Sequence, residues 1–200
     1  MKDSSQDVLE LIKRKICDLS RQQQRLTIAI DGRCASGKTT LALALKETLG
    51  CDCIHTDHFF LQEYQRTDER LREPGGNFDR ERFAAEVLSP LKKGEPFSYR
   101  PYDCRTKSFV APITVAADKI VVIEGAYSLH PQISEAYDLK IFMSVNKEEQ
   151  AHRLAQRNPA MIDQFLKRWI PLEEHYYTAT DIVSRCDIVI DNDVSDCREI

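Results

Sequence analysis

The chain has 200 residues, of which 42% are hydrophobic and 30% are charged, and its net charge is −4 at pH 7. This composition is typical of a globular protein, and the acidic balance argues against a general nucleic-acid binder. No apolar run approaches the roughly 20 residues of a membrane-spanning helix, and the first residues lack a signal-peptide core. We therefore expect one domain over residues 1–200, cytoplasmic, with neither a membrane nor a nucleic-acid polymer as partner.

In the first half of the chain, the hydrophobic pattern alternates between that of helices and that of strands. The predicted elements are, in order, a helix over residues 7–19, a strand over 26–30, a helix over 38–49, a strand over 51–55 and a helix over 80–88. Gly50 is expected to end the second helix, and Asp79 to cap the third. The polar residues 62–77 are expected to form a loop.

The second half continues this alternation. The predicted elements are a small β-excursion over residues 95–116, strands over 119–123, 139–145 and 187–190, and helices over 147–157 and 161–177, the last interrupted near Pro171. Strands that are almost wholly apolar and separated by helices indicate a mostly parallel sheet covered on both faces. The fold class is therefore α/β, and ligands are expected at the carboxyl ends of the strands.

The run from Gly32 to Thr40 has the pattern of a phosphate-binding loop, placed between a strand and a helix. Gly32 and Gly37 allow backbone angles at which successive N–H groups converge on one phosphate. Lys38 supplies a charge for the β- and γ-phosphates, and Thr39 a hydroxyl ligand for Mg²⁺. The residues expected to contact ATP are Gly32, Arg33, Cys34, Ala35, Ser36, Gly37, Lys38, Thr39 and Thr40.

Two acidic residues follow predicted strands near this loop. Glu124 is expected to hold a Mg²⁺-bound water, the alternative being a solvated carboxylate at a strand end. Asp57 is a candidate general base or, equally, a turn or helix-cap carboxylate. Arg153 and Arg157 share one helix face, which either closes over the phosphates as a lid or is a solvated basic face.

The seven cysteines indicate reduced thiols, because their number is odd and no Cys-x-x-Cys spacing occurs. Cys51 and Cys53 share one strand face without the grouped partners that a metal site needs. Cys34 lies near a helix N-terminus, which would lower the pKa of its thiol and make it sensitive to oxidation. The alternative that we favour is a small residue that fills the loop.

Five ordered segments together resemble the uridine kinase and phosphoribulokinase family of P-loop kinases. They are residues 30–40, 56–60, 77–79, 100–103, and 122–125 with 138–142. The resemblance spans roughly residues 26–192. It implies a P-loop NTPase-type three-layer αβα sandwich, with the β-excursion near the acceptor site and a helical lid and following helix over residues 153–178.

The resemblance also implies roles for matching residues. Asp57 would be the base toward a ribose 5′-hydroxyl, and Arg153 and Arg157 would belong to the lid. Phe78, Asp79 and Tyr102 would line the nucleoside site.

The chain departs from the family pattern on the acceptor side. Phe60 stands where uridine kinases usually have Tyr, and Cys104 and Lys107 stand where they usually have an aromatic residue and a pyrimidine-reading His. We keep Phe60 and Lys107 as predicted substrate-binding residues. These substitutions weaken the case for a pyrimidine acceptor more than they weaken the case for a kinase.

The predicted function is a kinase that uses ATP and Mg²⁺ and phosphorylates a small-molecule hydroxyl, most simply the 5′-hydroxyl of uridine or cytidine. Alternatives are a kinase for nicotinamide riboside, pantothenate or a sugar phosphate, and a nucleotide-binding module without turnover. A GTPase is a further alternative, since Asn146-Lys147-Glu148-Glu149 resembles a guanine-reading motif, but Glu149 replaces its Asp. A homo-oligomer is left open.

Overall fold

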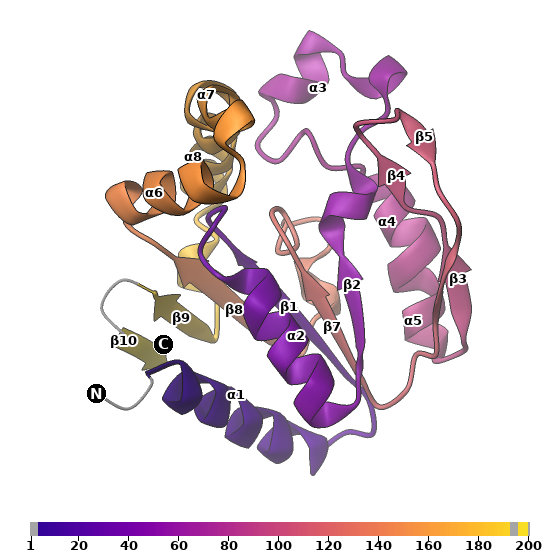
Figure 1. Ribbon diagram of the computed structural model, residues 1–200. Helices are drawn as coiled ribbons and strands as arrows, with labels where there is room; N and C mark the ends of the chain where they lie inside the picture. Colours follow the sequence, from indigo (N-terminus) through magenta and orange to yellow (C-terminus); the bar gives the residue numbers. More distant parts are fainter. Residues whose placement is uncertain (1–3, 193–195, 200) are drawn as a thin grey trace.

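The protein, described by a computed structural model over residues 4–192 and 196–199, is built on one six-stranded sheet (Figure 1). The strand order is β10-β9-β8-β1-β7-β2. The strands are β1 (Leu26–Gly32), β2 (Asp52–His55), β7 (Ile120–Glu124), β8 (Leu139–Ser144), β9 (Ile188–Asp191) and β10 (Asp196–Glu199). The strands β9, β8, β1, β7 and β2 are neighbours in this order, and each pair of neighbours is parallel. This confirms the mostly parallel α/β sheet.

Helices cover both faces of the sheet, which confirms the three-layer fold. On one face, α1 (Ser4–Ser20) and α2 (Lys38–Leu49) pack Ile12 and Leu45 into a core cluster with Ile28 of β1. On the other face, Ala29 of β1 belongs to a second cluster that contains Tyr176. The alternation along β1 is that of a strand with its side chains divided between two cores.

The sequence pattern does not predict the edge strand β10, since the last predicted strand covers residues 187–190. It pairs antiparallel with β9, in the register Cys197 opposite Ile190. Three of its four residues are charged, so its sequence has no apolar run. An edge strand needs a partner on one side only and tolerates charge, which explains the omission.

The helix predicted over residues 80–88 ends too early, and the interruption predicted near Pro171 takes the form of a π-helical turn. Residues 80–93 form one helix of α4 (Arg80–Phe83), a π-helical turn η3 (Ala84–Leu88) and α5 (Ser89–Lys93). Residues 162–180 likewise comprise α7 (Ile162–Gln164), the π-helical turn η6 (Phe165–Trp169) and α8 (Ile170–Thr180). Each π turn comes just before a helix that has Pro90 or Pro171 in its first turn. Proline has no N–H and crowds the preceding turn, and the wider π spacing accommodates it.

The predicted loop over residues 62–77 is partly helical. It contains the 3₁₀ turn η2 (Glu63–Gln65) and α3 (Asp68–Arg72), which is capped by Thr67 through a hydrogen bond from the N–H of Arg70, 3.1 Å long. Such short polar helices lack the apolar periodicity that identifies longer ones. A 3₁₀ turn, η1 (Thr56–Phe59), follows β2.

The β-excursion occurs where it was predicted. It consists of β3 (Phe97–Tyr99) paired with β6 (Ile113–Val115), and β4 (Tyr102–Asp103) paired with β5 (Ser108–Phe109). The remaining turns are η4 (Ser134–Ala136), η5 (Pro159–Met161) and η7 (Val183–Arg185).

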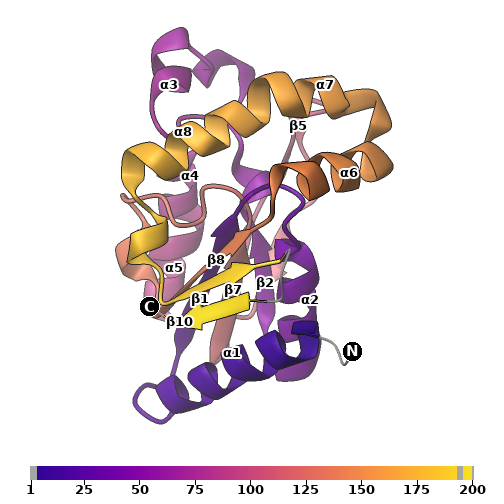
Figure 2. The same ribbon diagram turned by 90° about the vertical axis from the view of Figure 1, so that its left-hand side faces the viewer.

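The helices α6 to α8 include the residues 153–178 that were predicted as a lid and its following helix, and they are here called the lid; they lie together near the carboxyl ends of the strands. The helix α6 covers Lys147–Arg157, as predicted. Figure 1 shows the lid on one side of the top of the sheet and α3 with β4 and β5 on the other, and Figure 2 shows the lid from its outer side. No helix in the described part of the chain is both long and apolar enough to span a membrane.

Candidate active site

The phosphate-binding loop joins the end of β1 to the start of α2. Gly32 has φ +136°, and a Cβ there would lie 2.0 Å from the carbonyl oxygen of Met143, so only glycine fits against β8. Gly37 is the N-cap of α2 in the left-handed conformation, with φ 99°. The loop therefore has the tight turn and the helix N-terminus that an anion-binding loop requires.

Within this loop, the side chain of Lys38 is folded onto the backbone. Its Nζ donates to the carbonyl oxygens of Gly32 and Arg33, at 2.6 and 2.8 Å. Lys38 is only 8% exposed. A cation held in the centre of the loop is placed to neutralise a phosphate that enters it.

Thr39 and Glu124 meet beside the loop because β1 and β7 are parallel neighbours, with Ile30 opposite Glu124. Thr39 Oγ1 lies 3.2 and 3.3 Å from the two carboxylate oxygens of Glu124. His55 Nδ1 lies 2.5 Å from Glu124 Oε1, and this hydrogen bond raises the pKa of His55. A hydroxyl and a carboxylate at the mouth of a phosphate loop fit Mg²⁺, which prefers few protein oxygens and several waters.

Asp57 lies in η1, directly after β2, and faces the same cavity as Lys38 and Glu124. Asp57 is exposed to the cavity, and its carboxylate accepts no hydrogen bond from any side chain or backbone group that the structure describes. It does not cap η1, whose N-cap is His55. Desolvation by the surrounding protein raises the pKa of Asp57, and the charge of Glu124 adds to this, while Lys38 opposes it.

A cavity of about 1130 Å³ brings most of the predicted residues together. Its lining includes the loop residues Cys34, Ala35, Gly37, Lys38, Thr39 and Thr40 together with Asp57, Phe60, Glu124, Arg153 and Arg157. The loop residues Gly32, Arg33 and Ser36 do not line it. This volume is large enough for a nucleotide and a small second ligand.

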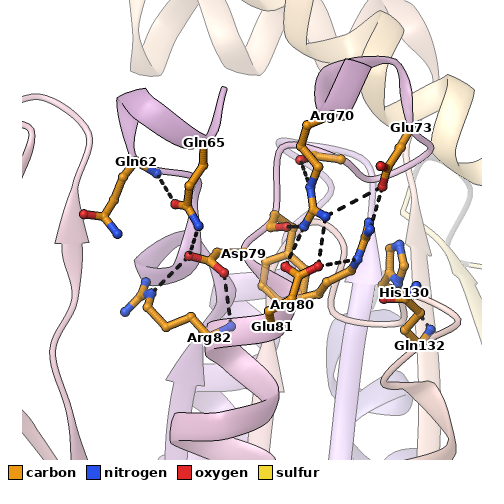
Figure 3. Close-up of polar contacts among 12 residues, drawn as sticks. Gln62, Gln65, Arg70, Glu73, Asp79, Arg80, Glu81, Arg82, His130 and Gln132 are labelled. Carbon is orange, nitrogen blue, oxygen red and sulfur yellow. Dashed lines mark hydrogen bonds and ion pairs between the residues drawn. The ribbon is translucent and has the colours of Figure 1, made fainter. Parts of the chain in front are cut away.

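Four predicted substrate residues lie outside this cavity. Phe78 is fully buried in the core, and Tyr102 packs edge-on against Phe109. The Asp79 carboxylate is turned toward Gln65 and Arg82 (Figure 3). Lys107 is exposed and pairs with Glu63 at 2.6 Å. Their contact with a substrate stays a prediction.

Several cavity residues carry no sequence signal for a site. Arg66 and Arg105 line the cavity near Cys104, and Arg66 donates to the sulfur of Cys104 at 3.7 Å. Glu173 of α8 also lines it, and its carboxylate accepts a hydrogen bond from the backbone N–H of Cys34. Their positions depend on how segments distant in the sequence pack, which no local pattern shows.

Of the two interpretations of Cys34, the structure contradicts the one with a lowered thiol pKa and leaves the favoured one, a small residue that fills the loop. Burial, together with the charge of Glu173, raises the pKa of its thiol to about 12. The thiol is therefore protonated at neutral pH and is a poor nucleophile and a poor target for oxidation. Among the described residues, no group of three or more His, Cys, Asp or Glu side chains is arranged to hold a metal. Cys51 and Cys53 therefore belong to no such group.

A family model and a curated relative both connect this chain with one family of kinases. Residues 27–160 match the Phosphoribulokinase / Uridine kinase family. The sequence is 28% identical over 148 residues to a probable uridine-cytidine kinase of Caenorhabditis elegans, an alignment that covers 65% of this chain and 60% of the relative. The chain thus spans about 60% of the length of that relative.

Solved structures share the fold. A possible uridine kinase from Bacillus stearothermophilus has a TM-score of 0.70 at 22% identity, covering 92% of this chain and 97% of that one. A D-glycerate 3-kinase from Cryptococcus neoformans has a TM-score of 0.64 at 13% identity, with both chains covered completely. A phosphoribulokinase from Rhodobacter spheroides has a TM-score of 0.50 at 18% identity, covering 84% and 70%. At these identities the likeness shows the fold alone.

Proposed function

The chain belongs to the phosphoribulokinase / uridine kinase family, and from that premise we propose that it transfers the γ-phosphate of ATP to a hydroxyl group of a small molecule. One observation carries the proposal. Lys38, Thr39, Asp57 and Glu124 come from three separate segments and face one cavity. Phosphoryl transfer needs a triphosphate cradle, a metal site and a group that orients the acceptor hydroxyl, and these four residues supply candidates for each.

The proposed mechanism assigns each residue one task. The loop amides and Lys38 would hold the triphosphate, while Thr39 and, through a bound water, Glu124 would hold Mg²⁺. When bound, Mg²⁺ neutralises charge on the phosphates. Asp57 accepts the proton of the attacking hydroxyl, because its carboxylate is accessible and has no other hydrogen-bond donor among the described residues. Arg153 and Arg157 offset the charge that develops on the transferred phosphoryl group.

For the acceptor, we propose a nucleoside such as uridine or cytidine. The match to a probable uridine-cytidine kinase supports this choice, as does Phe60, an aromatic side chain at the cavity wall on which a base can stack.

One observation favours a second candidate, a small acceptor that carries a phosphate or carboxylate. Arg66 and Arg105 both line the cavity, and Arg66 forms no ion pair with the residues that the structure describes. The guanidinium of Arg66 donates to the carbonyl oxygen of Leu61 and the sulfur of Cys104 but has no carboxylate partner among the described residues, and such a group in a cleft is suited to bind an anion. Lys107, which stands in place of the usual base reader, pairs with Glu63 instead of facing the cavity.

The acceptor is tested by following ADP release from MgATP with a panel of compounds. The panel holds uridine, cytidine, nicotinamide riboside, pantothenate and phosphorylated pentoses, and MgGTP replaces MgATP in a parallel series. Turnover with uridine or cytidine supports the nucleoside kinase, and turnover with only the acidic compounds supports the second candidate. Binding of MgATP without turnover of any compound would favour a module without catalysis.

A further inference from the structure

Glu173 is a buried carboxylate at the cavity that the proposed mechanism does not use. It lies in the first turn of α8, two residues after Pro171, and is 6% exposed. Its Oε2 accepts a hydrogen bond of 2.9 Å from the backbone N–H of Cys34. It lines the same cavity as Lys38 and Thr39. A side chain of the lid thus reaches the phosphate-binding loop itself.

The hydrogen bond between Glu173 and Cys34 uses a backbone N–H group of the phosphate-binding loop that a bound phosphate would need. In loops of this type, backbone N–H groups and the lysine together hold the phosphates. Here the amide of Cys34 is taken by the Glu173 carboxylate, whose charge also interacts with that of Lys38. The Lys38 ammonium, for its part, is bound to two loop carbonyls. One negative charge of the protein therefore lies at the cradle for a negatively charged ligand.

The lid is held on the loop by further contacts, which place Glu173 next to the phosphate-binding loop. Glu174, the next residue of α8, accepts hydrogen bonds of 2.6 and 3.0 Å from Arg33 through both of its carboxylate oxygens. From α6, Gln150 donates to the carbonyl of Cys34 at 3.0 Å. These contacts fix α8 and α6 against the loop, and the contact of Glu174 holds its neighbour Glu173 at the cradle.

We propose that Glu173 lowers the affinity of the protein for nucleotide, because its carboxylate occupies part of the anion cradle and repels the triphosphate. The proposal rests on the proposed function, since it requires that the cavity bind nucleotide. It makes Glu173 a residue that sets nucleotide affinity from the lid, distinct from the residues that hold the phosphates.

The test is the affinity for MgATP, without acceptor, of the wild type and Glu173→Gln at pH 8, measured by calorimetry. Burial raises the pKa of Glu173 to about 7, so the carboxylate is mostly ionised at pH 8 and glutamine removes its charge while keeping its shape. The matched control is Asp163→Asn. Asp163 is exposed and pairs with Lys167 at 3.0 Å, so this change removes one lid charge without touching the loop. Trp169, the single tryptophan of the chain, lines the cavity and gives a fluorescence readout of the same binding.

We expect Glu173→Gln to bind MgATP at least tenfold more tightly than the wild type, because repulsion between unit charges within about 10 Å of each other at an effective dielectric constant of about 20 corresponds to a factor of ten or more in affinity. Asp163→Asn should stay within about twofold. Equal or weaker binding by Glu173→Gln, with the control unchanged, would overturn the inference and make Glu173 a support of the loop. Absence of MgATP binding in all three proteins would overturn the proposed function as well. If Glu173→Gln does not fold, Glu173→Ala is judged by the same criterion.

Discussion

In the proposed mechanism, the carboxylate of Asp57 is the group that accepts the proton of the attacking hydroxyl. We expect Asp57→Asn to lower kcat by at least ~10²-fold, because an amide cannot accept the proton of the hydroxyl. Binding of MgATP should survive, since the side chain forms no hydrogen bond with the loop or with any other residue in the described ranges. Single-turnover kinetics with the best acceptor of the panel, combined with MgATP calorimetry, separates the two effects. Near-normal turnover would remove the assignment of Asp57 as base.

At the scale of elements, α8 is attached to the sheet through a buried carboxylate. Asp31, at the end of β1, is fully buried and accepts hydrogen bonds from the N–H groups of Gly32, Tyr127 and Leu129 and from the hydroxyl of Tyr176. Burial raises the pKa of Asp31, and the donors oppose that rise. Of these four donors, the Tyr176 hydroxyl belongs to the lid, and its oxygen lies 2.9 Å from Asp31 Oδ2.

This arrangement predicts opposite results for two adjacent tyrosines. Tyr176→Phe should lower the free energy of unfolding by about 1–3 kcal/mol, because a buried carboxylate loses one of its donors. Tyr177→Phe should be neutral or stabilising, since the hydroxyl of Tyr177 is buried and has no hydrogen-bond partner within the described residues. Urea unfolding of both variants measures the difference. Equal losses of stability would show that packing of the rings, and not the bond to Asp31, attaches the helix.

The elements that were predicted correctly are those whose hydrophobic pattern and capping residues lie within or next to the element itself. The strand β7 is a continuous apolar run, and α6 begins at Lys147 after Asn146, whose side chain caps it. The strand β10 and the helix α3 were missed because they are short and polar and depend on pairing or capping. The run of helix through Pro171 depends on a π turn that no local propensity indicates.

At the scale of the whole molecule, the candidate site divides in the same way. Lys38, Thr39, Asp57 and Glu124 were predicted to lie together because each follows a parallel strand, and such strands place their carboxyl ends at one edge. Arg66 and Glu173 were not found, since their places at the cavity depend on how α3 and the lid pack over that edge. On this fold, the residues that would bind the phosphates are thus easier to predict from sequence than the residues that line the rest of the cavity.

The packing of distant segments around His130 links the stability of the molecule to pH. His130 is 5% exposed and stacks on Tyr176 of α8 with ring centroids 6.2 Å apart. A Cβ at Gly75 would lie 2.8 Å from the His130 ring, so glycine lets the turn approach it closely. Arg80 lies beside His130 (Figure 3). Burial, followed by the charge of Arg80, lowers the pKa of His130 to about 4. The native state therefore excludes a proton that the unfolded chain binds below about pH 6.5.

The sign of the effect follows from linkage. Because the pKa is lower in the folded state, the neutral imidazole contributes stability above pH 6.5, and this contribution is lost as pH falls toward 4. Between pH 7 and pH 5 the wild type should lose about 1–2 kcal/mol more unfolding free energy than His130→Gln, which does not titrate. Urea unfolding of both proteins at the two pH values gives this difference and cancels the contribution of groups that titrate alike in both. A pH dependence that is the same in both proteins would mean that His130 takes up its proton without disturbing the contact between α8 and the sheet.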